Sequence, residues 1–324
     1  MNPRREAAAR LGGAYDVRVL EPSPPPVTDG PWLADDPVAR GESRGGAPIV
    51  SPVTTGDITW DELSHDDHDL ASWSADRWLG AWRSLPTVPD HDTFRSTRAA
   101  LHSLAEHVLA PARCDANGKV GLRYTRRGFG TPWFRRRGHD VQVRVDGMDL
   151  VVHRDGETRT APITTVADAA RMAGIAPGAP ADVYTPATRL APDAVLPLDR
   201  SGVRFLGAWY GFAASVLEQL RAESGPDDGA SRVQLWSEHF DLSVDLGNEQ
   251  ADARGTFGAS PGDDDIPDPY LYVTHWADVA PDPYWNEERF KGAALTVTAL
   301  TGAPDQREVA LTFFRRGLDL QRAR

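Results

Sequence analysis

The stretch VQVRVDGMDLVVHR, residues 141–154, decides the fold. Three valines alternate with polar residues in its first half, as they do in a β-strand with one buried face. Asp146 and Gly147 form a dipeptide typical of tight hairpin turns, and apolar residues resume directly after it. Asp155 and Gly156 repeat the turn signal. The sequence therefore predicts an antiparallel meander here.

Amphipathic helices are predicted on both sides of this meander. Asp90 is a suitable N-cap for a helix whose apolar residues follow the 3.6-residue period as far as Pro111. Helices and antiparallel strands occur in separate runs, which predicts the α+β class rather than a doubly wound sheet. Further helices are predicted at residues 165–173 and 206–220 and after Asp305, and further strands at residues 120–124, 233–235, 240–246, 270–276 and 295–300.

The chain organisation predicted is a leader followed by one globular domain. Residues 1–56 are rich in proline and carry no helical or strand period, so an extended or disordered leader is expected. Residues 57–324 are expected to fold as a single α+β domain. A proline-rich connector at residues 176–197 separates two similar helix-plus-meander halves, 57–178 and 198–324. Internal duplication is one interpretation of this likeness, and the partial match of any two amphipathic helices is the other.

Composition excludes several classes of function. The net charge of −12 opposes general binding to nucleic acid or to an anionic membrane, since both require a positive field. No apolar run approaches the ~20 residues that a membrane-spanning helix needs. The N-terminal residues lack the apolar core of a signal peptide, so a cytoplasmic location is expected.

The most informative segment for chemistry is WSEHFDLSVDL, residues 236–246. Its apolar residues alternate strictly, which places the intervening polar residues on the opposite face of the strand. A His-x-Asp pair on one face could share a metal or a proton with a third group, and His275 is the natural candidate. A solvated outer face is the alternative that a one-sided sheet favours. The polar row comprises His239, Asp241, Ser243 and Asp245.

Arginines and aromatic residues interleave at residues 123–138, a composition able to hold an anionic or aromatic ligand. Pairing with the protein's own carboxylates, for example Asp263, Asp264 and Asp265, is the favoured alternative. Together with the polar row, these features define the candidate ligand-binding residues. They are Trp236, His239, Asp241, Tyr270, Tyr272, His275, Arg126 and Arg127.

Two histidine-containing motifs receive a structural interpretation instead. In His102-x-x-x-Glu106-His107 the histidines are five residues apart, which fits neither zinc-protease pattern, so a solvated helix flank is expected. The cluster of His65, His68 and Asp69 is expected to be a charged turn or helix start.

The run Tyr124-Thr-Arg-Arg-Gly128, the following meander and the aromatic strand at residues 235–242 resemble an uncharacterised bacterial family, a domain of unknown function. The resemblance covers roughly residues 120–320. It implies no activity, so it assigns no catalytic residue and no cofactor.

Three functions follow from these residues. The leading hypothesis is binding of a small or peptide-like ligand in a cleft lined by aromatic and charged strand residues. The first alternative is a metal-assisted hydrolase with His239, Asp241 and His275 around an activated water. The second is a protein-interaction module that uses exposed tryptophans, of which the chain has ten. Whether the protein is an enzyme stays open, and its partner is a small molecule or a protein.

Overall fold

A computed structural model describes residues 84–125, 127–132, 134–155 and 157–323. The predicted leader, and the segment with His65, His68 and Asp69, lie outside these residues. About 35% of the described residues are helical and 25% are in strands, and all strand pairs that the structure describes are antiparallel. The predicted α+β class is therefore confirmed.

Two compact units make up the chain. In the part of the chain that the structure describes, the first unit consists of Val88–Ala208 and Leu235–Phe240. The second unit consists of residues 84–87, Trp209–Gln234 and Asp241–Arg324. The few positions that the structure does not describe are left out of both. Each unit contains helices and antiparallel strands. These bounds differ from the halves 57–178 and 198–324, and duplication stays a prediction.

In the first unit, one continuous helical run is formed by α5 (His91–Leu104), a π-helical turn (Ala105–Leu109) and α6 (Ala110–Asn117). The Asp90 carboxylate caps its start by accepting from the Thr93 amide at 3.1 Å, as predicted. The run passes through Pro111 instead of ending there. Pro111 has no N–H to donate to the preceding turn, and the His107 carbonyl accepts from the Gly178 amide at 3.0 Å.

The predicted meander is present in the first unit as three consecutive antiparallel strands, with Asp146-Gly147 at the first turn. The unit's sheet has the order β1-β2-β4-β5-β6, and β3 also pairs with β4. Helix α7 (Val166–Ala173) follows, capped by the Thr165 side chain, and contacts β5. The strands are β1 (Arg123–Thr125), β2 (Gly128–Gly130), β3 (Phe134–Arg136), β4 (His139–Asp146), β5 (Asp149–Arg154) and β6 (Glu157–Pro162).

This sheet buries polar groups on one of its two faces. The other face carries apolar residues such as Val143 and Val152, which lie opposite each other in the β4–β5 register. On the polar face Arg144 donates to Asp146 at 2.7 Å, and His153 hydrogen-bonds the Thr158 hydroxyl at 2.8 Å. At β4 and β5 both faces therefore exclude water, one by apolar packing and one by polar pairing, whereas the edge strand β6 is exposed.

In the second unit, β8, β9, β10 and β11 form a sheet of order β11-β10-β9-β8, whereas Leu235 and Trp236 of β7 belong to the first unit. The predicted strand at residues 295–300 is only partly correct, since β11 ends at Thr296 and the short helix α9 (Val297–Thr301) follows. The Thr296 hydroxyl caps that helix by accepting from the Ala299 amide at 3.4 Å. The strands are β7 (Gln234–Trp236), β8 (Asp241–Leu246), β9 (Gly255–Ser260), β10 (Tyr270–His275) and β11 (Gly292–Thr296).

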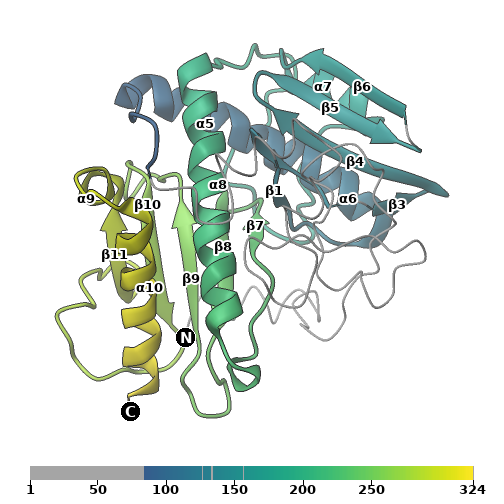
Figure 1. Ribbon diagram of the computed structural model, residues 1–324. Helices are drawn as coiled ribbons and strands as arrows, with labels where there is room; N and C mark the ends of the chain where they lie inside the picture. Colours follow the sequence, from purple (N-terminus) through teal and green to yellow (C-terminus); the bar gives the residue numbers. More distant parts are fainter. Residues whose placement is uncertain (1–83, 126, 133, 156, 324) are drawn as a thin grey trace, which may run out of the picture. The chain divides into compact units, whose positions relative to one another are not determined.

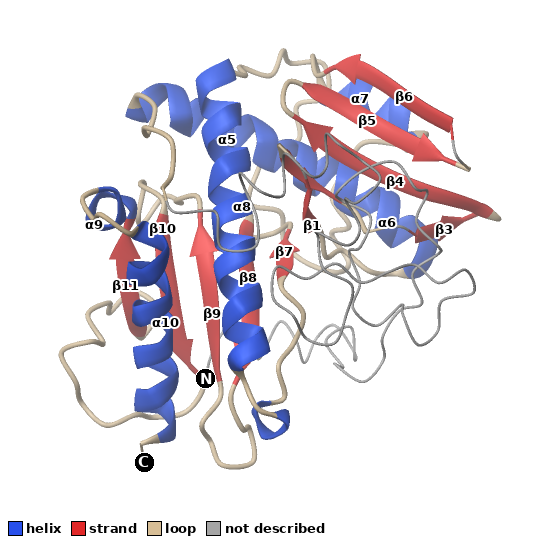
Figure 2. Ribbon diagram, in the orientation of Figure 1, coloured by secondary structure: helices blue, strands red, loops and turns tan. Residues whose placement is uncertain are grey.

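Helix α10 (Gln306–Arg322) packs on β9 and β10, where Phe314 meets Phe257 with ring centroids 6.1 Å apart. Figures 1 and 2 show α10 beside α8 (Arg200–Glu223), whose residues from Trp209 onward belong to this unit. No helix among the described residues is both long enough and apolar enough to span a membrane.

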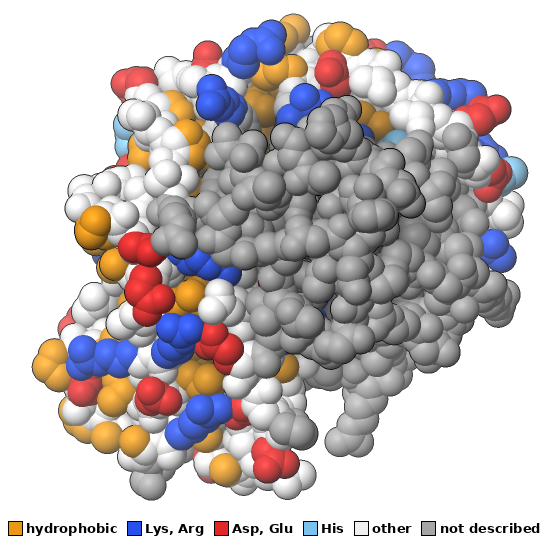
Figure 3. All heavy atoms as spheres, viewed as in Figure 1, with side chains coloured by type: hydrophobic (Ala, Val, Ile, Leu, Met, Phe, Trp, Pro, Cys, Tyr) orange, Lys and Arg blue, Asp and Glu red, His pale blue; other side chains and the backbone are white. Residues whose placement is uncertain are grey.

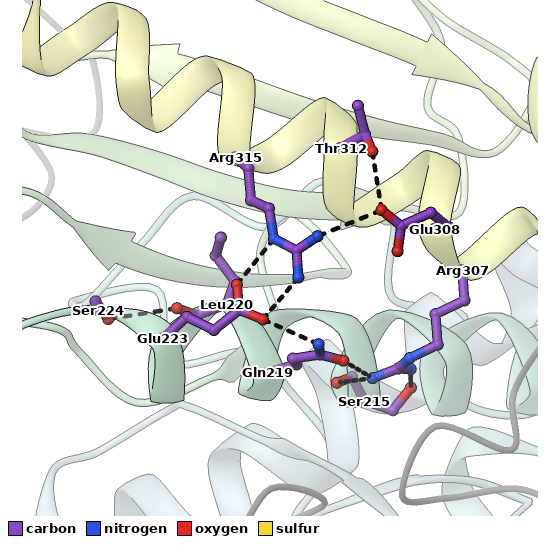
Figure 4. A network of polar contacts seen from close by, with 9 residues as sticks. All are labelled: Ser215, Gln219, Leu220, Glu223, Ser224, Arg307, Glu308, Thr312 and Arg315. Atoms are coloured by element: carbon purple, nitrogen blue, oxygen red, sulfur yellow. Dashed lines mark hydrogen bonds and ion pairs between the residues drawn. The ribbon is translucent and has the colours of Figure 1, made fainter.

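Polar contacts join these two helices (Figure 4). Arg307 donates to the Ser215 hydroxyl and to Gln219, each at 2.6 Å, and Arg315 donates to both carboxylate oxygens of Glu223 at 2.7 and 2.9 Å. The bond from Arg315 lowers the pKa of Glu223. Basic and acidic side chains are likewise interspersed over this unit in Figure 3. Many arginines therefore serve internal pairing.

Replacing Phe314 with alanine should destabilise the second unit by about 3–5 kcal/mol, because the ring is fully buried and its loss leaves a cavity. Phe313→Ala is the matched control, since that neighbouring ring is half-buried and its truncation should cost about 1–2 kcal/mol. Urea unfolding followed by tryptophan fluorescence measures both. Equal losses in the two variants would contradict this assignment of the core.

Candidate functional site

The predicted polar row begins two residues later than its alternation indicated, at Asp241 instead of His239. His239 lies in the turn before β8 and is exposed, so it does not extend from the strand. The reason is local, because Phe240 adopts a left-handed conformation with φ of 53° that interrupts extended backbone. The row therefore starts at Asp241, and His239 does not share its face.

The remaining row is buried, which corrects the expectation of a solvated outer face. Asp241 is 2% exposed and Ser243 is also buried, while Asp245 is half-buried. The register places Ser243 opposite Gly258, and Gly258 opposite Tyr272. Asp241, Ser243 and Tyr272 therefore share one face of the sheet, and the apolar partners of Phe257 occupy the other.

A tyrosine–carboxylate pair lies at the centre of this face. The Tyr272 hydroxyl donates to Asp241 Oδ2. The neighbouring Tyr270 hydroxyl donates to Asp263 Oδ2 at 2.7 Å. Burial, reinforced by the bond to Asp263, raises the pKa of Tyr270, so its hydroxyl remains a donor.

Phe290 completes an aromatic cluster with the two tyrosines. Its ring stacks on that of Tyr270 with centroids 6.3 Å apart and meets Tyr272 edge-on at 5.9 Å. The two tyrosine rings are themselves 6.0 Å apart. Phe290 and Asp263 are half-buried, whereas Tyr272 and Asp241 are buried. The cluster thus runs from a partly accessible end to an enclosed end. We call Asp241, Asp263, Tyr270, Tyr272 and Phe290 the tyrosine–carboxylate cluster.

His275 does not join this cluster. It ends β10 on the opposite face from Tyr272, and its Nδ1 lies 2.7 Å from the Ala277 carbonyl. Its ring packs edge-on against Trp285 at 5.2 Å. The structure therefore does not bring His239, Asp241 and His275 together as a ligand set. In the described part of the chain, no group of three or more His, Cys, Asp or Glu side chains is arranged to hold a metal ion.

The remaining sequence candidates belong to the first unit. Trp236 is half-buried at the end of β7, and Arg126 lies outside the described residues. Arg127 is exposed and pairs with Asp146, which raises the pKa of the guanidinium. Arg136 pairs with Asp115 at 2.8 Å. The arginine stretch does pair with the protein's own carboxylates, although these partners differ from the ones expected.

The structure shows a second polar cluster where a solvated helix flank was expected. His102, Glu106 and His107 lie on or just before the π-helical turn, and all three side chains are largely or fully buried. Glu106 accepts from the amides of Ala187 and Thr188 at 2.8 and 2.7 Å. Sequence spacing missed this cluster because it assumed a regular α-helical period, whereas a π-turn changes which residues share a face.

Comparisons with protein-family profiles, curated proteins and solved structures give no match for this chain. The two clusters are therefore assigned from the chain's own geometry, and the resemblance to an uncharacterised bacterial family stays a prediction.

Gly258→Ala should break the Tyr272–Asp241 bond. A methyl group at position 258 would overlap the Tyr272 ring, so the ring must move away from its carboxylate partner. We expect a loss of about 1–3 kcal/mol in the free energy of unfolding. In a Tyr272→Ala background the same glycine substitution should cost much less, because the overlap is absent. A double-mutant cycle measures the difference, and simple additivity would contradict the contact.

His102 should make the first unit less stable in acid. Burial lowers the pKa of His102 from its usual 6.5, against the opposing effect of Glu106, while Arg98 and His107 also favour the neutral ring. His102 Nε2 donates to the Ser237 carbonyl at 2.9 Å, a bond that the neutral ring can make.

Below about pH 6.5, His102 therefore binds a proton in the unfolded chain but remains neutral in the folded chain until the pH is lower. The free energy of unfolding should fall as pH decreases through this range, by at most about 1.4 kcal/mol per pH unit. His102→Gln should flatten that dependence between about pH 5 and 8, whereas His91→Gln, at an exposed position, should preserve it. An unchanged slope in His102→Gln would be contrary to this account.

Proposed function

We propose that this protein binds a small, peptide-like ligand carrying an amino or amide N–H donor, on the polar face of the second unit's sheet. The observation that carries this proposal is the buried Asp241 carboxylate beside three clustered aromatic rings. Antiparallel sheets commonly leave their second face to water, whereas here that face is buried and rich in hydrogen-bonding groups.

The chemistry of the cluster favours a donor-rich or cationic ligand. Asp241 and Asp263 are acceptors, each for one tyrosine hydroxyl, and Asp263 Oδ1 also accepts from the amides of Asp265 and Ile266 at 2.8 and 2.7 Å. Aromatic faces attract ammonium groups electrostatically. An anionic ligand would meet two carboxylates here, and Arg127 belongs to the first unit, where Asp146 already engages it.

The residues of the tyrosine–carboxylate cluster are more accessible at one end than at the other, which supports entry of a ligand from the accessible end. The half-buried Asp263 and Phe290 are reached first, and the buried Tyr272 and Asp241 are reached last. A ligand that follows this order exchanges its hydration for contacts with rings and carboxylates, which is how small-molecule sites combine apolar walls with a few polar anchors.

Neither alternative function gains comparable support. Asp241 and His275 lie on opposite faces of the sheet, which leaves the metal-assisted hydrolase without a supporting observation. The interaction module was based on exposed tryptophans. Of the tryptophans that the structure describes, Trp209 is buried and Trp236, Trp276 and Trp285 are half-buried.

The proposal is tested by titrating the full chain with a defined panel: the standard amino acids, their amides, short dipeptides, putrescine and spermidine. Tryptophan fluorescence and thermal unfolding report binding. At least one compound should quench fluorescence and raise the melting temperature. Asp241→Asn should weaken that response at least tenfold, because a bond to a charged acceptor contributes about 1.5–3 kcal/mol.

Asp245→Asn is the matched control. Asp245 lies on the same strand and face but accepts from the Thr256 hydroxyl at 2.8 Å and is not part of the tyrosine–carboxylate cluster, so the response should be retained. Circular dichroism verifies that both variants fold. The proposal fails if no compound in the panel acts on the wild-type chain, or if the two asparagine variants respond alike.

A further inference from the structure

The connector, residues 176–197, is attached to the first unit while burying little of its own side-chain surface. All of its residues are half-buried or exposed, and Val195 is 78% exposed. Tyr184 is half-buried, but its hydroxyl oxygen is buried, and burial raises the pKa of this phenol. Among the described residues, its one β-type contact is the bridge between Val195 and Thr165. A segment with so little apolar burial has a low free energy of local opening compared with a core strand.

Polar contacts to the π-helical turn hold the middle of the connector. Glu106 accepts from the Ala187 amide, the Thr188 amide and the Thr188 hydroxyl at 2.8, 2.7 and 2.5 Å. His107 Nε2 lies 3.1 Å from the Thr188 carbonyl. Towards the end of the connector, the Leu196 amide donates to the Thr164 carbonyl at 2.9 Å.

The buried side of this contact is charged. Glu106 is fully buried, and a buried carboxylate is stable only while hydrogen-bond donors replace its lost hydration. The three donors from Ala187 and Thr188 are the ones that the connector supplies. If the connector were released, water would replace these donors around Glu106. The carboxylate would then be hydrogen-bonded both with the connector in place (the docked state) and with the connector released (the open state).

His107 adds a strained element to the docked state. The single proton of the Thr188 hydroxyl goes to Glu106, so His107 Nε2, which lies 3.1 Å from both the carbonyl and the hydroxyl oxygen of Thr188, must carry the proton of that contact. Nδ1 is then the lone-pair nitrogen. This nitrogen is buried and has no hydrogen-bond partner among the described residues, which destabilises the docked state. In the open state, water could donate a hydrogen bond to it.

We propose that the connector is an openable strap, that Glu106 is its latch, and that opening uncovers Glu106 and His107 as an accessible carboxylate–imidazole pair. The strap opens as a local unit while the sheet of the first unit remains folded. This inference is independent of the ligand-binding proposal, because all its contacts lie within the first unit.

Native-state hydrogen exchange of the wild-type full chain is the primary test. The amides of Ala187 and Thr188 are hydrogen-bonded, yet they should exchange at least 100-fold faster than the amides of the central strand β4, and with little dependence on urea. If they exchange at the rate of the β4 amides and with the same urea dependence, the connector opens only with global unfolding and the strap is refuted.

Glu106→Gln tests the latch. The amide keeps one acceptor but turns its NH2 group toward a backbone donor, so at least one bond is lost. Exchange at Ala187 and Thr188, and tryptic cleavage after the exposed Arg189, should accelerate at least tenfold. Mass spectrometry of the peptide starting at Leu190 gives the cleavage rate.

Glu157→Gln is the matched control, since Glu157 is an exposed residue of β6 in the same unit, and it should leave both rates unchanged. Equal exchange and cleavage rates in the two variants would refute the assignment of Glu106 as the latch. The wild-type exchange measurement still decides the strap if Glu106→Gln does not fold.

Discussion

Buried polar side chains must find hydrogen-bond partners, and this constraint governs both sheets of the protein. In the first unit Arg144 bonds Asp146, and in the second Tyr272 bonds Asp241. Each pair lies on the sheet face that a simple antiparallel architecture would leave to water. A polar face that excludes water is specific in what it accepts, because each buried donor or acceptor tolerates only a complementary neighbour.

Alternation and capping residues predicted the parts of the fold that depend on local chemistry. The valines of β4, the Asp146-Gly147 turn and the Asp90 cap all lie where expected. Strand β9 was missed, because its sequence GTFGAS contains two glycines and one large apolar residue, so it shows no alternation. Its register depends on pairing with β8 and β10, and a local sequence pattern carries no information about such pairing with other strands.

The candidate site illustrates a different limit. Alternation correctly placed Asp241 and Ser243 on one face, but it carries no information on whether that face meets water. It also extended the row to His239, because a left-handed residue such as Phe240 leaves no clear signal in a strand-like pattern. In the first unit, an ideal helical period separates His102 from His107, whereas the chain forms a π-turn at Ala105–Leu109 that this period does not reveal. Both errors concern backbone departures that tertiary contacts stabilise.

Pro111 shows how local and global preferences conflict within one helix. A residue with an N–H at this position could donate to the His107 carbonyl within the helix, whereas Pro111 has no N–H to give. That carbonyl accepts from the amide of Gly178, 71 positions further along the chain. The proline thus weakens the local hydrogen bonding of the helix at a point where the fold supplies a long-range hydrogen bond, so the stability of this turn depends on tertiary structure.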